Sequence, residues 1–144
     1  MYHPQQAGLE FVELTNIGPE TIDLNMVSFT NGIEFTFGPY KLGPGQYVVV
    51  VEDMEAFGAK YGQLGQVAGQ YKGNLSNAGE QIRLQDPTGK VILEFTYDDG
   101  WYKSTDGAGY SLVVRDLGCE SDLLSQRSAW MPGTRIGGSP CKGE

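Results

Sequence analysis

The sequence is poor in the residues that most often carry catalysis or bind metals. Its 144 residues include one histidine, His3, and two cysteines, Cys119 and Cys141. A nucleophile activated by histidine needs that base on a rigid scaffold beside it, and His3 lies in the terminal segment. Two cysteines are too few for a structural zinc site or a disulfide scaffold. We therefore expect no catalytic residues and no enzyme activity.

Positive charge and long apolar runs are also scarce. The chain has 10 Lys and Arg against 18 Asp and Glu, a net charge of −8, and residues 1–58 hold eight acids but a single base, Lys41. Nucleic-acid binding depends mainly on clustered cations, so it is not expected here. No stretch approaches the ~18–20 apolar residues of a transmembrane helix, so no membrane insertion is expected. The acids indicate either a solvated surface or a cation site among them.

What the sequence does contain is turns and short strands. The 21 glycines disfavour helices, and apolar residues alternate with polar ones in short runs between turn signals, which is typical of an all-β sandwich or barrel. Residues 47–51 form a β-branched run expected to be buried on both faces. One short helix is predicted at residues 53–60, with Asp53 as its N-cap. The predicted core is Val12, Leu14, Ile22, Leu24, Phe29, Val48, Val50, Ile82, Leu84, Ile92 and Leu112.

The chain is expected to be a single domain spanning residues 1–144, with an irregular tail from 116 to 144. The two cysteines lie in that tail. A disulfide between Cys119 and Cys141 would close a moderate loop, indicate an oxidising compartment and hold Trp130 against the domain. The alternative is two unpaired thiols.

Two groups of residues are candidates for ligand binding. Asp98, Asp99 and Asp106 could hold a calcium ion, although no defined calcium loop is present; otherwise they are turn residues that cap backbone N–H groups. Calcium is the one cofactor that the sequence suggests. Aromatic side chains in or near loops either contact a ligand or seal the ends of the core; they are Trp101, Tyr102, Tyr110 and Trp130.

Several sequence blocks, in order, resemble the lamin tail domain family. The first runs from "EFVELTN" through "IDL" to "VSF", the second is "LGPGQYVVV", the third is "LSNAGEQIRL" followed by the turn "DPTG", and the last two are "DGAGYSL" and "GGSP". They begin at Glu10, Leu42, Leu75, Asp106 and Gly137.

This resemblance implies an immunoglobulin-like two-sheet β-sandwich with one short helix. It also implies a non-catalytic structural or interaction module of a larger secreted or cell-surface bacterial protein, located outside the cell or on its surface. The partner would be a protein or a cell-surface polymer. A carbohydrate- or calcium-binding accessory domain is the alternative.

Two departures from the family pattern carry expectations of their own. Val27 stands where the family usually has a core tryptophan, so Phe29, Phe35 or Phe37 should fill the space. The apolar strand that usually precedes Tyr2 is reduced to Met1, so we expect an excised domain with an exposed strand edge. Because Glu10 and Glu13 lie near that edge, like-charge repulsion should favour a monomer at low salt.

Overall fold

The computed structural model describes residues 1–142, which form eleven strands, one α-helix and three short 3-10 helices. The strands are β1 (Phe11–Thr15), β2 (Ile22–Asp23), β3 (Ser28–Asn31), β4 (Phe35–Thr36), β5 (Lys41–Leu42), β6 (Tyr47–Val51), β7 (Val67–Gln70), β8 (Glu80–Gln85), β9 (Val91–Tyr97), β10 (Tyr110–Val114) and β11 (Trp130–Ile136). The helices are α1 (Met54–Tyr61), η1 (Asp99–Trp101), η2 (Ser121–Ser125) and η3 (Arg127–Ala129).

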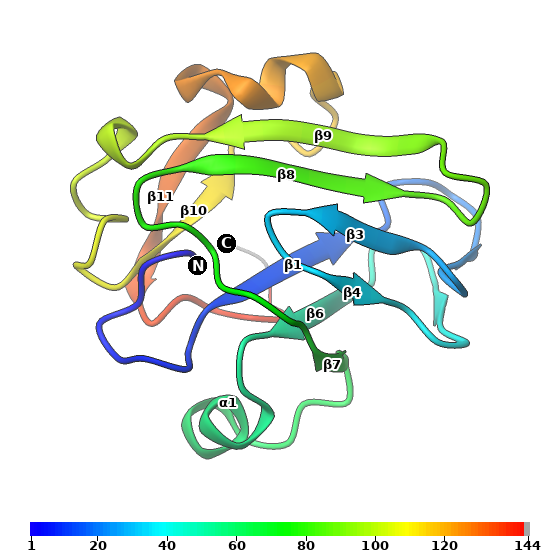
Figure 1. Cartoon of the computed structure of the whole chain (residues 1–144), viewed down its shortest axis with the longest axis horizontal. Coiled ribbons are helices and arrows are strands. Elements are labelled where there is room, and N and C mark those ends of the chain that lie inside the picture. The colour runs from blue at the N-terminus through cyan, green and yellow to red at the C-terminus, as the bar shows by residue number, and fades with distance from the viewer. Residues whose placement is uncertain (143–144) are drawn as a thin grey trace.

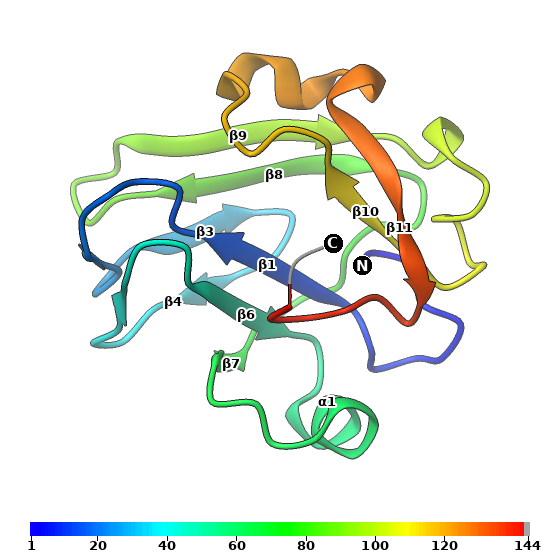
Figure 2. The same cartoon turned by 180° about the vertical axis from the view of Figure 1, so that it is seen from behind.

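The strands form two layers around one core. One layer is the four-stranded sheet β4-β3-β8-β9, and the other contains the three-stranded sheet β1-β6-β7. Figure 2 shows β1 and β6 in front of β3 and β4. The buried side chains between the layers include Phe29 and Leu84 from the first and Val48 and Val50 from the second. The predicted all-β sandwich with one short helix is confirmed.

Strand β6 is buried on both faces, as its β-branched run predicts. Val48 and Val50 face the central core, whereas Val49 and Val51 pack with Phe57 of α1 in a second cluster. Figure 1 shows α1 beside β6, outside the sandwich. The helix begins where expected, because the Asp53 side chain accepts hydrogen bonds from the N–H groups of Glu55 and Ala56. No helix within residues 1–142 is long and apolar enough to span a bilayer.

Phenylalanines fill the region around Val27, as expected. Val27 is buried, and the Phe37 ring lies 4.9 Å from that of Phe35 and 6.4 Å from that of Phe29, measured between centroids. The Phe37 backbone is fixed as well, because its N–H donates to the Val27 carbonyl and its carbonyl accepts from Met26. Phe37 is therefore the centre of a cluster of three phenylalanine rings, which takes the place of a single larger ring.

Two predicted core residues are exposed. Ile22 is 40% exposed, because the two-residue strand β2 pairs only with β5 and turns Leu24 rather than Ile22 into the core. Ile92 is 50% exposed, since the β8–β9 register shifts between the pairs Leu84↔Leu93 and Gln85↔Val91. Such a bulge reverses which residues face the core, so the predicted alternation is wrong there.

The C-terminal segment is more regular than predicted. Residues 116–144 include the seven-residue strand β11, which pairs antiparallel with β10. The sequence signals against a strand were Pro132 and Gly133. Proline is tolerated on an edge strand, and β11 is an edge of its two-stranded sheet.

Candidate functional site

The predicted ligand-binding aromatics are largely engaged with one another and with the backbone. The indole N–H of Trp130 donates to the Leu124 carbonyl at 2.7 Å, and the Trp130 ring lies 5.1 Å from Phe95 and 6.4 Å from Trp101. Tyr102 donates to the Trp130 carbonyl at 3.0 Å. The cluster contacts η2 through Leu124 and η3 through Arg127, whose carbonyl accepts from the Tyr102 hydroxyl.

Tyr102 and Tyr110 have different surroundings. A hydrogen bond with Arg115 lowers the pKa of Tyr102, and the guanidinium of Arg127 lies 4.7 Å from the Tyr102 ring centroid. Tyr110 begins β10, and its N–H donates to the Ser104 carbonyl. The structure thus brings Trp101, Tyr102 and Trp130 together. Sugar stacking by these rings stays a prediction.

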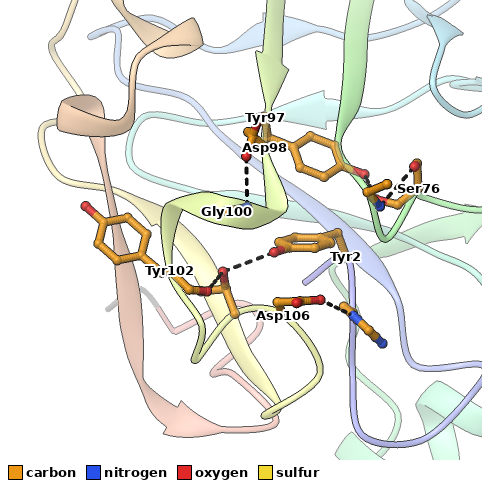
Figure 3. A network of polar contacts seen from close by, with 10 residues as sticks. Tyr2, Ser76, Tyr97, Asp98, Gly100, Tyr102 and Asp106 are labelled. Atoms are coloured by element: carbon orange, nitrogen blue, oxygen red, sulfur yellow. Dashed lines mark hydrogen bonds and ion pairs between the residues drawn. The ribbon is translucent and has the colours of Figure 1, made fainter.

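The three aspartates proposed for calcium do not converge. The Asp98 carboxylate accepts from the Gly100 N–H at 2.8 Å and caps η1, whereas the Asp106 carboxylate bonds His3 Nδ1 at 2.7 Å (Figure 3). Within residues 1–142 no group of three or more His, Cys, Asp or Glu side chains is arranged to hold a metal ion. Asp98 and Asp106 thus have separate partners, and calcium binding by Asp98, Asp99 and Asp106 stays a prediction.

These same contacts fasten the N-terminal segment to the loop before β10. The Tyr2 hydroxyl lies 3.2 Å from the Thr105 hydroxyl, and the Gln5 amide donates to the Ala108 carbonyl (Figure 3 shows the Tyr2 contact). Together with the pair of His3 and Asp106, they hold residues 2–5 in place. Met1 is consequently held beside β1, where its ammonium donates to the Phe11 carbonyl at 3.1 Å.

Glu10 is buried, so the acidic side chains do not all lie on a solvated surface. Glu10 accepts from the Leu75 N–H at 2.7 Å and from the Tyr71 hydroxyl at 3.0 Å. Burial raises the pKa of Glu10 and, with the neighbouring Glu10 charge, raises that of Tyr71 as well. Glu10 ties β1 to the segment that leads into β8. The sequence suggested that Glu10 places a charge near an exposed strand edge. Its side chain is instead buried.

The two cysteines are free, so the predicted disulfide between Cys119 and Cys141 is absent. The Cys141 N–H donates to the side chain of Glu13 on β1, whereas the Cys119 N–H donates to Asp116 in the turn after β10. The two residues are thus held by different parts of the fold. Trp130 is held by its indole hydrogen bond and by the β10–β11 ladder rather than by a bridge.

Alkylation should reveal these two free thiols. Treating the native chain with iodoacetamide is expected to add two carbamidomethyl groups, as counted by intact mass spectrometry. Burial raises the pKa of the Cys141 thiol to about 11, and only the thiolate reacts, so Cys141 should modify slowly near pH 8 and faster after denaturation. A chain that gains mass only after reduction would contradict the free state.

One hollow in the described structure is an apolar groove of about 390 Å³. It lies between β1 and β10 and reaches the inner face of the sandwich at Leu93, Phe95 and Trp130. Its walls are mainly apolar, with Glu13 and Arg115 as charged members, and Ser139 and Pro140 close part of it. We call this hollow the β1–β10 groove.

Sequence reasoning missed this groove. The alternation in β1 predicts that Val12 and Leu14 lie in the core, and they do pack against it from partly buried positions. Whether a neighbouring strand covers them depends on pairing between distant segments, which the local pattern does not contain.

Comparison with protein families gives one match: the lamin tail domain model matches residues 1–99. That family consists of immunoglobulin-like, non-catalytic interaction modules. The matched range contains β1 to β9 and α1, which make up both layers around the core. It also contains residues 1–5, which are hydrogen-bonded to the loop before β10. The comparison with curated proteins found no match.

Proposed function

Since this chain belongs to the lamin tail domain family, we propose that it is a non-catalytic module that mediates protein–protein contacts for a larger secreted or cell-surface bacterial protein. The β1–β10 groove is the observation that carries this proposal. A groove of about 390 Å³ with mainly apolar walls offers the desolvated contact area on which protein interfaces depend.

The chemistry of the titratable groups supports a binding role rather than catalysis. An active site requires convergent groups around a reacting atom. His3 is paired with Asp106 at the surface, and Glu10 is committed to the Leu75 N–H and the Tyr71 hydroxyl. These groups are engaged with partners inside the fold and do not converge on one reacting atom.

The location outside the cell rests on the acidic net charge of −8 and on the resemblance of the sequence blocks to bacterial secreted members of the family. The free thiols of Cys119 and Cys141 do not add to that argument. A cell-surface polymer is the competing partner, and the aromatic cluster around Trp130 would be its contact.

Binding to cell envelopes distinguishes these partners. The purified chain should be retained by envelopes of the organism that encodes it, and retention should fall after protease treatment but not after glycan hydrolysis. Two exposed leucines give a matched pair of variants: Leu117 lines the β1–β10 groove and Leu123 does not. We expect Leu117→Glu to reduce retention about tenfold or more and Leu123→Glu to leave it unchanged. Retention that survives protease and is lost with the glycan would overturn the protein-contact proposal.

A further inference from the structure

The turn between β3 and β4 contains the one Asn-Gly pair of the sequence. The five asparagines are Asn16, Asn25, Asn31, Asn74 and Asn77, and only Asn31 is followed by glycine. The backbone nitrogen of the residue after an asparagine can attack the side-chain amide carbon, and a side chain on that following residue obstructs the approach. Glycine has no Cβ and lets backbone atoms come close. Asn31 is therefore the asparagine most open to this attack, and the proposed function makes no use of it.

The fold places the two reacting groups of this pair next to each other. Asn31 is the exposed last residue of β3, and the Gly32 N–H donates to its Oδ1 at 3.1 Å. The Gly32 nitrogen thus lies against the amide that it would attack. A hydrogen bond to Oδ1 also draws electrons away from the amide carbon, which makes that carbon more electrophilic.

A second contact holds the Asn31 side chain in this orientation. Its Nδ2 donates to Gln81 Oε1 at 2.8 Å, and Asn31 itself pairs with Arg83 of β8. Figure 1 shows β3 between β8 and β4, so the side chain is anchored from the neighbouring strand. Holding two reacting groups together in this way removes part of the entropic cost of closing a ring.

The turn cannot exchange Gly32 for a residue that would shield Asn31. Gly32 has a φ of 82°, in the left-handed region that residues with a Cβ rarely adopt. A Cβ built on Gly32 would overlap Ile82 Cδ1 and would lie 3.0 Å from the Gln81 carbonyl oxygen. The hairpin thus requires the same glycine that leaves the Asn31 amide open to attack.

We infer that Asn31 is a site of spontaneous deamidation in the folded chain, with water as the only co-reactant. The Gly32 nitrogen gives its proton to solvent and bonds to Cγ of Asn31, while the bond from Cγ to Nδ2 breaks and the nitrogen leaves as ammonia. The product is a cyclic imide, a succinimide. Water then opens this ring at either carbonyl. Breaking the bond from Cγ to the Gly32 nitrogen leaves aspartate, and breaking the bond from the main-chain carbonyl leaves isoaspartate. Nothing is oxidised or reduced.

The two products should affect the hairpin differently. Aspartate keeps the natural backbone, and Gln81 can turn its side-chain amide to donate to the new carboxylate. Isoaspartate adds a carbon to the main chain at the point where Gly32 packs against Ile82, next to the buried Ile33. Closely packed interiors tolerate such an insertion poorly. Isoaspartate should therefore weaken the β3–β4 hairpin, whereas aspartate should preserve it.

Ageing the natural chain in its folded state tests the inference. The chain is incubated at mildly alkaline pH and physiological temperature, and peptide mapping by mass spectrometry follows each asparagine. We expect Asn31 to convert about tenfold or more faster than Asn25 and Asn77, which are also exposed but precede methionine and alanine. Ammonia should appear in step with the loss of Asn31.

Two variants separate the steps. Asn31→Gln keeps a primary amide at the same exposed position, but the longer side chain must close a larger ring, so ammonia should appear about tenfold or more slowly. Asn31→Asp represents the aspartate product, and its urea midpoint should match that of the natural chain. The isoaspartate fraction of the aged chain, separated by ion exchange, should have a lower midpoint. Asn25 and Asn77 are controls within the unaltered chain, so the test does not depend on either variant folding.

Several results would overturn the inference. An Asn31 that stays intact in the folded chain but converts in urea would show that the fold protects it. Conversion of Asn25 or Asn77 at the same rate would show that Gly32 brings no advantage. Unchanged ammonia release from Asn31→Gln would place the reactive amide elsewhere, and an isoaspartate fraction as stable as Asn31→Asp would contradict the effect on the hairpin. Envelope retention is a separate measurement, because the inference does not rest on the β1–β10 groove.

Discussion

Replacing Phe37 with alanine is expected to lower the free energy of unfolding by about 3–5 kcal/mol, the range for deleting a buried phenylalanine ring. Phe37 is 1% exposed and contacts the rings of Phe35 and Phe29. Removing the Phe37 ring leaves a cavity beside Val27 that no larger neighbouring side chain fills. Urea denaturation should show a lower midpoint with an unchanged slope.

Two further variants serve as controls for Phe37. Phe37→Leu keeps most of the volume and should cost clearly less than the alanine variant. Ile136→Ala removes a side chain that is 62% exposed and should change stability by no more than about 0.5 kcal/mol. A Phe37→Ala chain as stable as Ile136→Ala would show that the aromatic cluster does not hold the sandwich together.

Glu10→Ala is the second change with a large expected effect, a loss of about 2–6 kcal/mol in the free energy of unfolding. The carboxylate accepts from the Leu75 N–H and the Tyr71 hydroxyl, both in buried surroundings. Deleting it leaves two buried donors without a partner, each costing about 1–3 kcal/mol. Glu10→Gln keeps an acceptor oxygen and should cost less. Chemical denaturation of the three chains at pH 7 measures the difference, and equal losses for both variants would contradict a hydrogen-bonding role.

The same residue gives a pH dependence with a defined sign. Burial raises the pKa of Glu10, and the nearby Glu52 charge adds to this, while the bonds from Leu75 and Tyr71 and the terminal ammonium oppose it. A carboxyl whose pKa is higher in the folded state stabilises most below its unfolded pKa of about 4.3. That contribution is lost as the pH rises through the folded value. Glutamine does not titrate, so Glu10→Gln should gain stability relative to the natural chain over that pH range.

Local patterns in the sequence were sufficient for the elements that form from neighbouring residues. The Asp53 cap and the apolar residues after it specify α1 because a helix N-terminus is satisfied within one turn. The β-branched run of β6 specifies a strand buried on both faces, since no polar side chain interrupts it. The family blocks then identified the sandwich, because their order reflects the order of its strands.

Other features depended on contacts between distant segments. Ile92 is exposed because a bulge in the β8–β9 register changes which side chains face inward, and the run of residues in β9 gives no sign of it. Pro132 and Gly133 suggested an irregular tail, yet the tail pairs with β10 as an edge strand, where the missing proline N–H is tolerated. Cys119 and Cys141 suggested a bridge from their spacing alone, but separate backbone hydrogen bonds hold them in different places.

The sequence by itself determined that this protein is an acidic β-sandwich with one short helix and a lamin-tail pattern, because alternation, caps and turns act over a few residues. Only the tertiary structure decided that Glu10 is buried beneath Leu75 and that β1 and β10 leave a groove between them. Burial and the groove are set by which distant strands meet. Those pairings are fixed by the packing of the whole domain, not by the residues of any one strand.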